Sequence, residues 1–250
     1  RVDRRQRQMC IRDSPMTGND KKAALTERLA KCYSGAVYDA LRERGIDNTV
    51  LPKDIRPIDD IHVLAGPVFT ISGTPKPGIS ADDALLAWTG FLSTAPSGHV
   101  VVCNGHTDDI AMMGELSAET LQMRGVRGYV TNGGCRDSNF IRNIGFPVFH
   151  RFYTPRDVVG AWSVDDIEVS VQIGEVVVKP GDFLIADIDG AILIPGEIAE
   201  EIVAEVEEVM NTENKVRSAI RSGTDPKEAY LTYGLSLIHI SEPTRRRGMS

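Results

Sequence analysis

The stretch GELSAETLQMRGVRGYVTNGGCRDSNFIRNIGFPVF, residues 114–149, decides the fold. It contains the candidate strand 126–131 and runs into a second one, 146–152, with a polar segment the length of a helix between them. A third run, 100–103, lies upstream and is continuously apolar, which is typical of a strand covered on both faces. We expect a helix from about 109 to 124. The order strand, helix, strand, helix, strand then predicts parallel strands joined by right-handed crossovers.

The segments upstream of this unit extend the α/β pattern. Apolar residues between 25 and 44 have helical spacing, either as one amphipathic helix or as two short ones broken near Gly35. The segment 62–73 predicts a buried strand, and 80–93 predicts a helix.

The last third of the chain has a different character. Four β segments between 167 and 195 are separated by Gly, Pro and Asp, which predicts hairpins. Pro195 opens a predicted helix that runs through about Ser222. The sequence therefore predicts one mixed α/β domain with a parallel sheet, C-terminal hairpins and a C-terminal helix.

The two ends of the chain look foreign to the rest. LSLIHISEPTR, residues 235–245, resembles a translated transposase sequencing adapter, and RRQRQMCIRDS, residues 4–14, resembles its partner in the opposite sense. We therefore interpret 1–15 and 235–250 as adapter-like scars and 16–234 as the α/β domain. A pair of natural basic tails is the alternative interpretation.

Composition limits the class of protein. The 250 residues are 42% hydrophobic and 25% charged, which suits a globular domain. The net charge of −7 becomes more negative without the arginine-rich ends, so we expect no binding to nucleic acid. Outside the scars, the cysteines have no CxxC spacing, so neither disulfides nor a zinc site are predicted. No apolar run is long enough to span a membrane, so we expect no membrane association and a cytoplasmic protein.

Two loops carry the candidate chemistry, and each follows one of the predicted strands. In the first loop, Gly114 allows close approach of the backbone, and the N–H groups of Glu115, Leu116 and Ser117 would have no intrahelical partner. Such a helix start is a binding site for a substrate carboxylate. Glu115 also brings a carboxylate that could hold water near a metal.

The second loop places Arg136 beside Asp137 after two glycines. Arginine offers a planar fork of donors that stays charged, and aspartate offers the hard oxygen that Mg²⁺ or Mn²⁺ prefers. Because the carboxyl ends of neighbouring parallel strands meet at one edge of a sheet, we expect the two loops to face each other. The alternative is a solvated turn in which Asp137 caps the following helix.

The combination suits an α-keto acid. Asp137 would be the metal ligand, the helix start would bind the substrate carboxylate, and Arg136 would face the oxygen that becomes an enolate. Two other acidic motifs have structural interpretations: Asp108 and Asp109 would cap the helix after them, and the motif DIDG at 187–190 would form a hairpin turn.

The segment 114–149 strongly resembles the signature of the RraA-like family, which includes 4-hydroxy-4-methyl-2-oxoglutarate aldolases and a regulator of ribonuclease E activity. Further support comes from SGAVYDAL near Ala36, AGPVFTISG at 65–73 and VVVKPGDFLIADIDGAILIP at 176–195. The resemblance implies a single swivelling β/β/α domain that assembles as homotrimers or hexamers with sites near subunit boundaries.

In the aldolase branch, the resemblance implies that Asp137 holds the metal, that Arg136 contacts substrate and that Gly114, Glu115, Leu116 and Ser117 form the substrate-binding stretch. It also implies a glutamate from a neighbouring subunit, for which four residues of the C-terminal helix stay open: Glu200, Glu201, Glu205 and Glu207. The sequence departs from the family pattern at Asn132, Cys135 and Met112-Met113, which we expect to flank the pocket and to affect substrate identity.

Two functions follow from the resemblance. The first is a metal-dependent class II-type lyase that cleaves a carbon–carbon bond of a small oxo acid through a pyruvate enolate, as a 4-hydroxy-4-methyl-2-oxoglutarate aldolase, an oxaloacetate decarboxylase or both. The alternative is a non-catalytic regulator that binds a ribonuclease.

Overall fold

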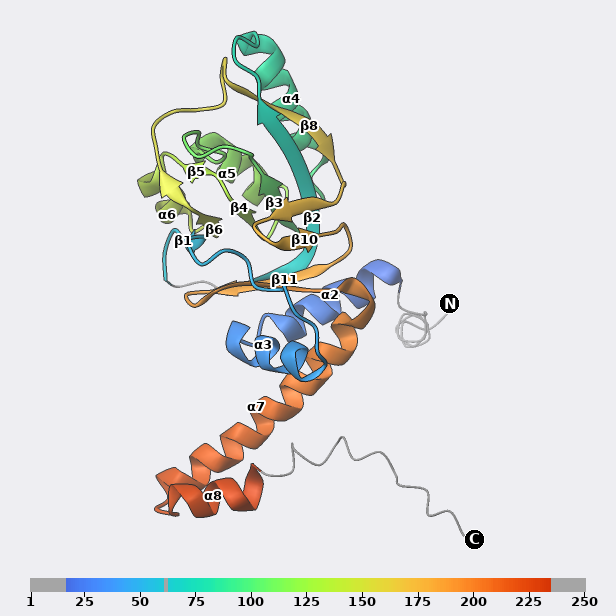
Figure 1. Cartoon of the computed structure of the whole chain (residues 1–250), viewed down its shortest axis with the longest axis vertical. Coiled ribbons are helices and arrows are strands. Elements are labelled where there is room, and N and C mark those ends of the chain that lie inside the picture. Colours follow the sequence, from blue (N-terminus) through green and yellow to red (C-terminus); the bar gives the residue numbers. More distant parts are fainter. Residues whose placement is uncertain (1–16, 61–62, 235–250) are drawn as a thin grey trace, which may run out of the picture.

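The computed structural model describes residues 17–60 and 63–234, so both expected scars lie outside the described residues. Within the described residues, helices cover one face of a mixed sheet, and helices from the two ends of the chain pack together beneath it (Figure 1). The predicted mixed α/β fold, with a mostly parallel sheet and a C-terminal helix, is confirmed. No helix in the described ranges is both long and apolar enough to cross a membrane.

The main sheet of the described chain has eight strands. They are β1 (Arg56–Pro57), β2 (Leu64–Pro75), β3 (Val100–Asn104), β4 (Gly128–Thr131), β6 (Val148–His150), β8 (Trp162–Ile167), β11 (Phe183–Asp187) and β12 (Gly190–Ile194). The order is β1-β6-β4-β3-β2-β11-β12, and β8 pairs with the other end of β2. The contacts β2–β3, β3–β4 and β4–β6 are parallel, as predicted, and antiparallel strands flank this centre.

Two small sheets complete the β structure. The parallel pair is β5 (Gly134–Cys135) with β7 (Phe152–Tyr153), and the antiparallel pair is β9 (Val171–Ile173) with β10 (Val176–Val178). The predicted hairpins are present as β9–β10 and β11–β12.

Strand β3 illustrates why the centre of the sheet is apolar throughout. Successive side chains point to opposite faces, so Val101 and Cys103 join the cluster beneath the helices, whereas Val100 and Val102 join a cluster on the other face. All four side chains are fully buried. Burial on both faces removes the need for polar alternation.

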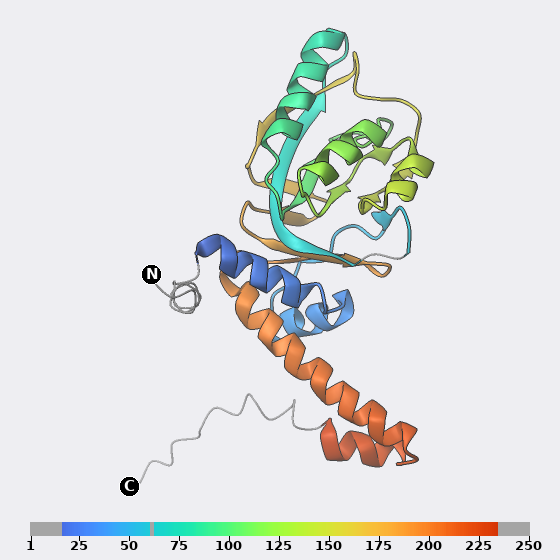
Figure 2. The ribbon, with the colours of Figure 1, turned by 180° about the vertical axis from the view of Figure 1, so that it is seen from behind.

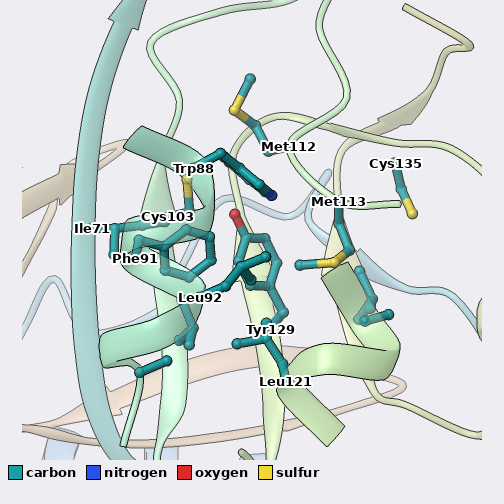
Figure 3. Packing of buried hydrophobic residues seen from close by; sticks show 14 of the residues in the cluster. Ile71, Trp88, Phe91, Leu92, Cys103, Met112, Met113, Leu121, Tyr129 and Cys135 are labelled. Atoms are coloured by element: carbon teal, nitrogen blue, oxygen red, sulfur yellow. The ribbon is translucent and has the colours of Figure 1, made fainter. Parts of the chain in front are cut away.

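Three helices cover the face that carries Val101: α4 (Ala81–Thr94), α5 (Glu115–Met123) and α6 (Ser138–Ile144). Aromatic, aliphatic and sulfur-containing side chains fill the cluster between these helices and the sheet (Figure 3). The Trp88 ring packs edge-on against Phe91, with 4.9 Å between ring centroids, and against Trp162 at 5.9 Å. Trp88 and Trp162 are buried, as expected for packing residues.

The remaining helices form the lower layer. They are α2 (Gly18–Leu29), α3 (Ser34–Glu43), the short 3₁₀ helix η1 (Gly196–Ile198), α7 (Ala199–Arg221) and α8 (Pro226–Tyr233). The first turns of α7 pack with α2 and α3 against β11 and β12. Figures 1 and 2 show that α7 then extends away from the body, where α8 folds back along it.

Two helix predictions differ from the structure in their bounds. The segment 25–44 belongs to two helices, as one of the two alternatives expected, and the break lies at 30–33, just before the expected position near Gly35. The helix expected from 109 starts only at Glu115, because residues 110–113 are buried and hydrogen-bond to the neighbouring loop instead. The residues at 110–113 are apolar because they are buried where their backbone pairs with other loops, and the spacing of apolar residues along the chain does not distinguish this from a helix.

Candidate active site

The two predicted loops lie side by side because β3 and β4 are parallel neighbours. Backbone hydrogen bonds join the loops: Met112 N–H donates to the Gly134 carbonyl at 2.8 Å, and Arg136 N–H donates to the Met113 carbonyl at 2.9 Å. Gly134 N–H donates in return to the Ile110 carbonyl at 3.0 Å. This strip fixes the start of α5 against the Arg136–Asp137 pair.

Gly114 is where the two loops come closest. A Cβ at this position would lie 2.8 Å from Asp137 Oδ2 and 3.2 Å from Arg136 Nε, closer than side-chain carbons pack. Asp137 Oδ2 also accepts a hydrogen bond from Glu115 N–H at 3.2 Å. Glycine leaves room for the carboxylate and the guanidinium where they lie beside the helix start, and a larger residue would displace at least one of them.

Asp137 faces α5 and does not cap its own helix. It is the N-cap residue of α6, with a left-handed φ of 55°, but its side chain makes no capping hydrogen bond there. The alternative interpretation, a simple capping turn, is therefore wrong. Left-handed backbone in a non-glycine residue costs free energy and is concentrated at functional sites.

Asp157 is a site residue that the sequence did not reveal. Its Oδ2 lies 2.9 Å from Arg136 Nη1, and its Oδ1 accepts a hydrogen bond from Val159 N–H at 3.1 Å. Arg136 Nε is also 3.4 Å from Asp137 Oδ2, so the guanidinium bridges two carboxylates. The sequence indicated only that a half-buried arginine needs an acidic partner. It did not indicate which of the many acidic residues is the partner of Arg136.

The start of α5 offers fewer donors than expected. Ala118 N–H makes the first bond to the Gly114 carbonyl, so Glu115, Leu116 and Ser117 have no acceptor within the helix. Because the Glu115 N–H already donates to Asp137, the donors at hand for a ligand are those of Leu116 and Ser117. The Ser117 hydroxyl accepts a hydrogen bond from Trp88 Nε1 at 2.8 Å, which ties α5 to α4.

These groups surround a cavity of about 380 Å³. All six residues predicted to form the site line it: Gly114, Glu115, Leu116, Ser117, Arg136 and Asp137. Asp157 lines it as well, together with apolar side chains of α4 and of the 157–159 segment. The side chains of Arg136 and Asp137 are 37% and 39% exposed, so a ligand in the cavity can reach both.

The donor set fits a hydrated magnesium-type ion. Among the described residues, no cluster of three histidine, cysteine or acidic side chains could enclose a metal. Asp137 provides one hard carboxylate at the cavity, and its contacts to Glu115 N–H and Arg136 both use Oδ2. Mg²⁺ keeps several waters and commonly binds through one or two carboxylates plus its substrate. Zinc or calcium would require more protein ligands.

Several other expectations are corrected or refined. Asp108 and Asp109 do not cap a helix, because α5 starts only at Glu115 with Gly114 as its N-cap residue; instead they form ion pairs with Arg151 and Arg156. The motif DIDG at 187–190 is the β11–β12 turn, as expected.

Of the residues where the sequence departs from the family pattern, Met113 lines the cavity, whereas Cys135 and Met112 are buried beside it. Asn132 hydrogen-bonds to Asn104 and to Gly105 N–H, each at 2.9 Å, so it braces the loop.

The four candidate glutamates of α7 form ion pairs with other helices of the lower layer. Glu200 and Glu207 pair with Arg28 of α2, and Glu201 and Glu205 pair with Arg44 of α3. Figure 1 places α7 beneath β11, away from α5. The glutamate expected from a neighbouring subunit stays a prediction.

Comparison with known proteins identifies the family of the chain. The family model RraA-like, Aldolase/RraA, matches residues 34–193. Protein DlpA of Legionella pneumophila is 27% identical over 219 residues, which cover 86% of this chain and 34% of DlpA. The chain thus spans about a third of the length of that relative.

Two further matches carry different descriptions. A protein of Halalkalibacterium halodurans named "Putative 4-hydroxy-4-methyl-2-oxoglutarate aldolase" is 24% identical over 184 residues, which cover 73% of this chain and 84% of that protein. The crystal structure of Streptomyces coelicolor RraAS2, described as an unusual member of the RNase ES inhibitor RraA protein family, is 25% identical. Its TM-score is 0.68, and the match covers 82% of this chain and 98% of that one.

Proposed function

The chain belongs to the RraA-like family, and from that premise we propose that it is a divalent-metal-dependent carbon–carbon lyase acting on a small oxo acid. The reaction passes through a pyruvate enolate, as in cleavage of 4-hydroxy-4-methyl-2-oxoglutarate or decarboxylation of oxaloacetate. The observation that carries the proposal is the meeting of Arg136, Asp137 and the start of α5 at one cavity. A relative named as a candidate aldolase supports it.

Each residue has a separate role in this proposal. The N–H groups of Leu116 and Ser117 bind the substrate carboxylate at the positive end of the helix. Arg136 stabilises the negative charge that develops on the keto oxygen as the carbon–carbon bond breaks, and Asp157 holds the guanidinium in place. Glu115 accepts a hydrogen bond from a water that exchanges a proton with the substrate.

Asp137 would hold Mg²⁺ or Mn²⁺. When bound there, the cation would act as a Lewis acid that polarises the keto group. The half-exposed position of the Asp137 carboxylate at the cavity supports this assignment.

The test is release of pyruvate from oxaloacetate and from 4-hydroxy-4-methyl-2-oxoglutarate with Mg²⁺ or Mn²⁺, with and without EDTA. We expect EDTA to abolish release and Arg136→Ala to lower kcat by about 10² to 10³-fold, because it removes a stabiliser of transition-state charge. Arg156→Ala is the matched control, since Arg156 is exposed, pairs with Asp109 and does not line the cavity. Activity that resists the chelator, or that survives Arg136→Ala, would contradict the proposal.

A second candidate function is a non-catalytic regulator that binds a ribonuclease. The likeness to the Streptomyces coelicolor structure favours it. A stable complex with a ribonuclease, together with no pyruvate release from any oxo acid, would reverse the ranking of the two functions.

We also propose that the protein is cytoplasmic and assembles as a homotrimer or hexamer. Light scattering coupled to size-exclusion chromatography measures the assembly, and cell fractionation measures the location. A monomeric protein would contradict the proposed assembly and the expected glutamate from a neighbouring subunit.

A further inference from the structure

Three hydroxyl side chains line the cavity among the described residues: Thr89, Ser117 and Thr120. Two of them are committed to their own helices. The Thr89 hydroxyl donates to the Leu85 carbonyl at 2.7 Å, and the Thr120 hydroxyl donates to the Leu116 carbonyl at 2.6 Å. Such bonds to the carbonyl four residues earlier are common in helices and use up the proton of the hydroxyl.

The Ser117 hydroxyl is held differently. The carbonyl four residues earlier belongs to Met113, which lies outside α5 and accepts the Arg136 N–H at 2.9 Å. The Ser117 oxygen accepts the Trp88 indole N–H at 2.8 Å, and an indole N–H cannot accept a hydrogen bond in return. No residue in the described ranges accepts a hydrogen bond from the Ser117 hydroxyl, so its proton is available to a ligand.

The position of Ser117 in α5 directs this proton to the helix start. Side chains of a helix lean toward its N-terminus, so the hydroxyl of the third residue lies back over the first turn. The N–H groups of Leu116 and Ser117 are free in the same turn. Ser117 is half-buried and lines the cavity, which makes its hydroxyl a third donor beside these two N–H groups.

Trp88 fixes the direction of the hydroxyl. Its ring is only 7% exposed and packs edge-on against Phe91 and Trp162 within the buried cluster (Figure 3). Trp162 is fixed in turn, because its own indole N–H donates to the Gly105 carbonyl at 2.6 Å. A ring enclosed in this way keeps its N–H in one direction. One lone pair of the Ser117 oxygen is therefore always occupied from the side of α4.

Building on the proposed lyase function, we infer that the Ser117 hydroxyl donates a hydrogen bond to the substrate carboxylate and that Trp88 is the positioning residue that turns the hydroxyl toward it. A carboxylate keeps its charge while the carbon–carbon bond breaks. The hydrogen bond is therefore equally strong before and in the transition state, and it contributes to KM rather than to kcat.

The first test removes the hydroxyl. We expect Ser117→Ala to raise KM for oxaloacetate by about 10-fold with little change in kcat, because one hydrogen bond to a charged group is lost. Calorimetry with pyruvate in the presence of Mg²⁺ should show a rise in Kd of about the same size. Thr120→Val is the matched control, since Thr120 lies in the same helix and lines the same cavity but its hydroxyl is already bonded to Leu116.

The second test asks whether Trp88 acts through Ser117. Trp88→Phe keeps an aromatic ring and removes the N–H, so it should raise Kd for pyruvate by several-fold, up to about 10-fold, in the wild-type background. In the Ser117→Ala background it should leave Kd unchanged, because the group that it positions is already gone. A role in packing alone would lower the melting temperature and change Kd equally in both backgrounds. Binding of Mn²⁺ alone should be the same in all four proteins, since Asp137 is untouched.

A third measurement does not depend on the folding of Trp88→Phe. The chain has two tryptophans, and the indole N–H signal that Ser117→Ala displaces in a proton NMR spectrum belongs to Trp88. A hydroxyl that donates to a carboxylate becomes a stronger acceptor. Pyruvate with Mg²⁺ should therefore move the Trp88 signal downfield in the wild type and leave the Trp162 signal in place.

The outcomes separate this inference from the proposed function. Pyruvate release with a raised KM in Ser117→Ala, and no further effect of Trp88→Phe in that background, supports both. Pyruvate release with unchanged KM and Kd in Ser117→Ala overturns the role of the hydroxyl and leaves the lyase intact. Equal effects of Trp88→Phe in both backgrounds, or no downfield movement of its signal, overturn the positioning role of Trp88.

Two further outcomes concern the lyase itself. Pyruvate that binds with the expected pattern, while no oxo acid is cleaved, overturns the lyase function and leaves the carboxylate contact. A wild-type protein that neither releases nor binds pyruvate overturns both.

Discussion

At the scale of single residues, the candidate site depends on contacts between segments that are far apart along the chain. Asp157 is the clearest case, because it holds Arg136 from a segment 21 residues away along the chain. The ion pair is partly exposed, so its contribution to stability is small, whereas its effect on the direction of the guanidinium is direct.

Replacing Asp157 tests that positioning role. We expect Asp157→Asn to lower kcat by about 10-fold with little change in KM, because Arg136 loses the partner that aims it while the helix start still binds substrate. The melting temperature should stay close to that of the wild type. Asp108→Asn is the control, since it breaks an exposed ion pair with Arg151. A change in KM alone would mean that Asp157 acts on binding and not on positioning.

Gly114→Ala tests the close approach. The added methyl group would displace Asp137 or Arg136, and we expect a loss of about 10²-fold in kcat/KM together with weaker Mn²⁺ binding by calorimetry. Gly90→Ala is the matched control, since a Cβ at Gly90 in α4 meets nothing within 4 Å. It should stabilise the protein by about 0.5 to 1 kcal/mol without loss of activity. Full activity in Gly114→Ala would show that the close contact is not required.

At the scale of elements, the β11–β12 turn caps a helix that is distant in the sequence. The N-cap residue of α3 is Tyr33, which makes no side-chain capping bond. The Asp187 side chain caps the helix in place of Tyr33. One of its carboxylate oxygens accepts a hydrogen bond from Ser34 N–H at 2.8 Å, and the other accepts one from the Ser34 hydroxyl at 2.7 Å. The motif at 187–190 therefore joins the lower layer to the sheet.

Loss of this cap should lower global stability. We expect Asp187→Ala to reduce the free energy of unfolding in urea by about 1 to 2 kcal/mol, because a buried cap is lost. Asp189→Ala, in the same turn but exposed, should change it by less than about 0.5 kcal/mol. Equal effects of the two changes would indicate that the turn itself, and not the cap, stabilises α3.

At the scale of the whole molecule, one buried histidine links folding to pH. Burial lowers the pKa of His150 from its ordinary value of 6.5, and nearby Arg142 adds to the effect, although a hydrogen bond to the Phe152 carbonyl opposes it. The folded protein holds His150 neutral, whereas the unfolded chain binds a proton below about pH 6.5. The contribution to stability is therefore present above that pH and is lost as the pH falls toward the lower folded pKa.

This linkage predicts how steeply the free energy of unfolding changes with pH. As the pH falls from about 6.5 toward the folded pKa, His150 should contribute a fall in the free energy of unfolding of up to about 1.4 kcal/mol per pH unit. Urea titrations of the wild type and His150→Gln at several pH values measure it. The two curves should run parallel above pH 7 and diverge in slope below pH 6.5. Parallel curves over the whole range would mean that His150 is not the group responsible.

The sequence alone predicted the parallel centre of the sheet and the two loops that form the candidate site. Strand β3 and its neighbours are recognisable because burial on both faces requires an unbroken apolar run, and this signal is local. Gly114, Arg136 and Asp137 can also be identified locally, because the residue types themselves indicate the chemistry: glycine allows close approach, arginine carries a fixed charge and aspartate offers a hard oxygen. Parallel pairing of β3 and β4 then brings the loops together, as the order of strands and helices predicts.

Only the tertiary structure decided which distant groups complete the site. The pairing of residues 110–113 with the next loop shortened the predicted helix, and Asp137 turned toward α5 instead of capping α6. Asp157 and apolar side chains of α4 line the cavity because the fold brings them there from distant parts of the chain. The physical reason is that periodicity and capping act within a few residues, whereas a counter-charge or a cavity wall is selected by distance in space. Nothing in the letters near Arg136 specifies which of many carboxylates lies 2.9 Å away.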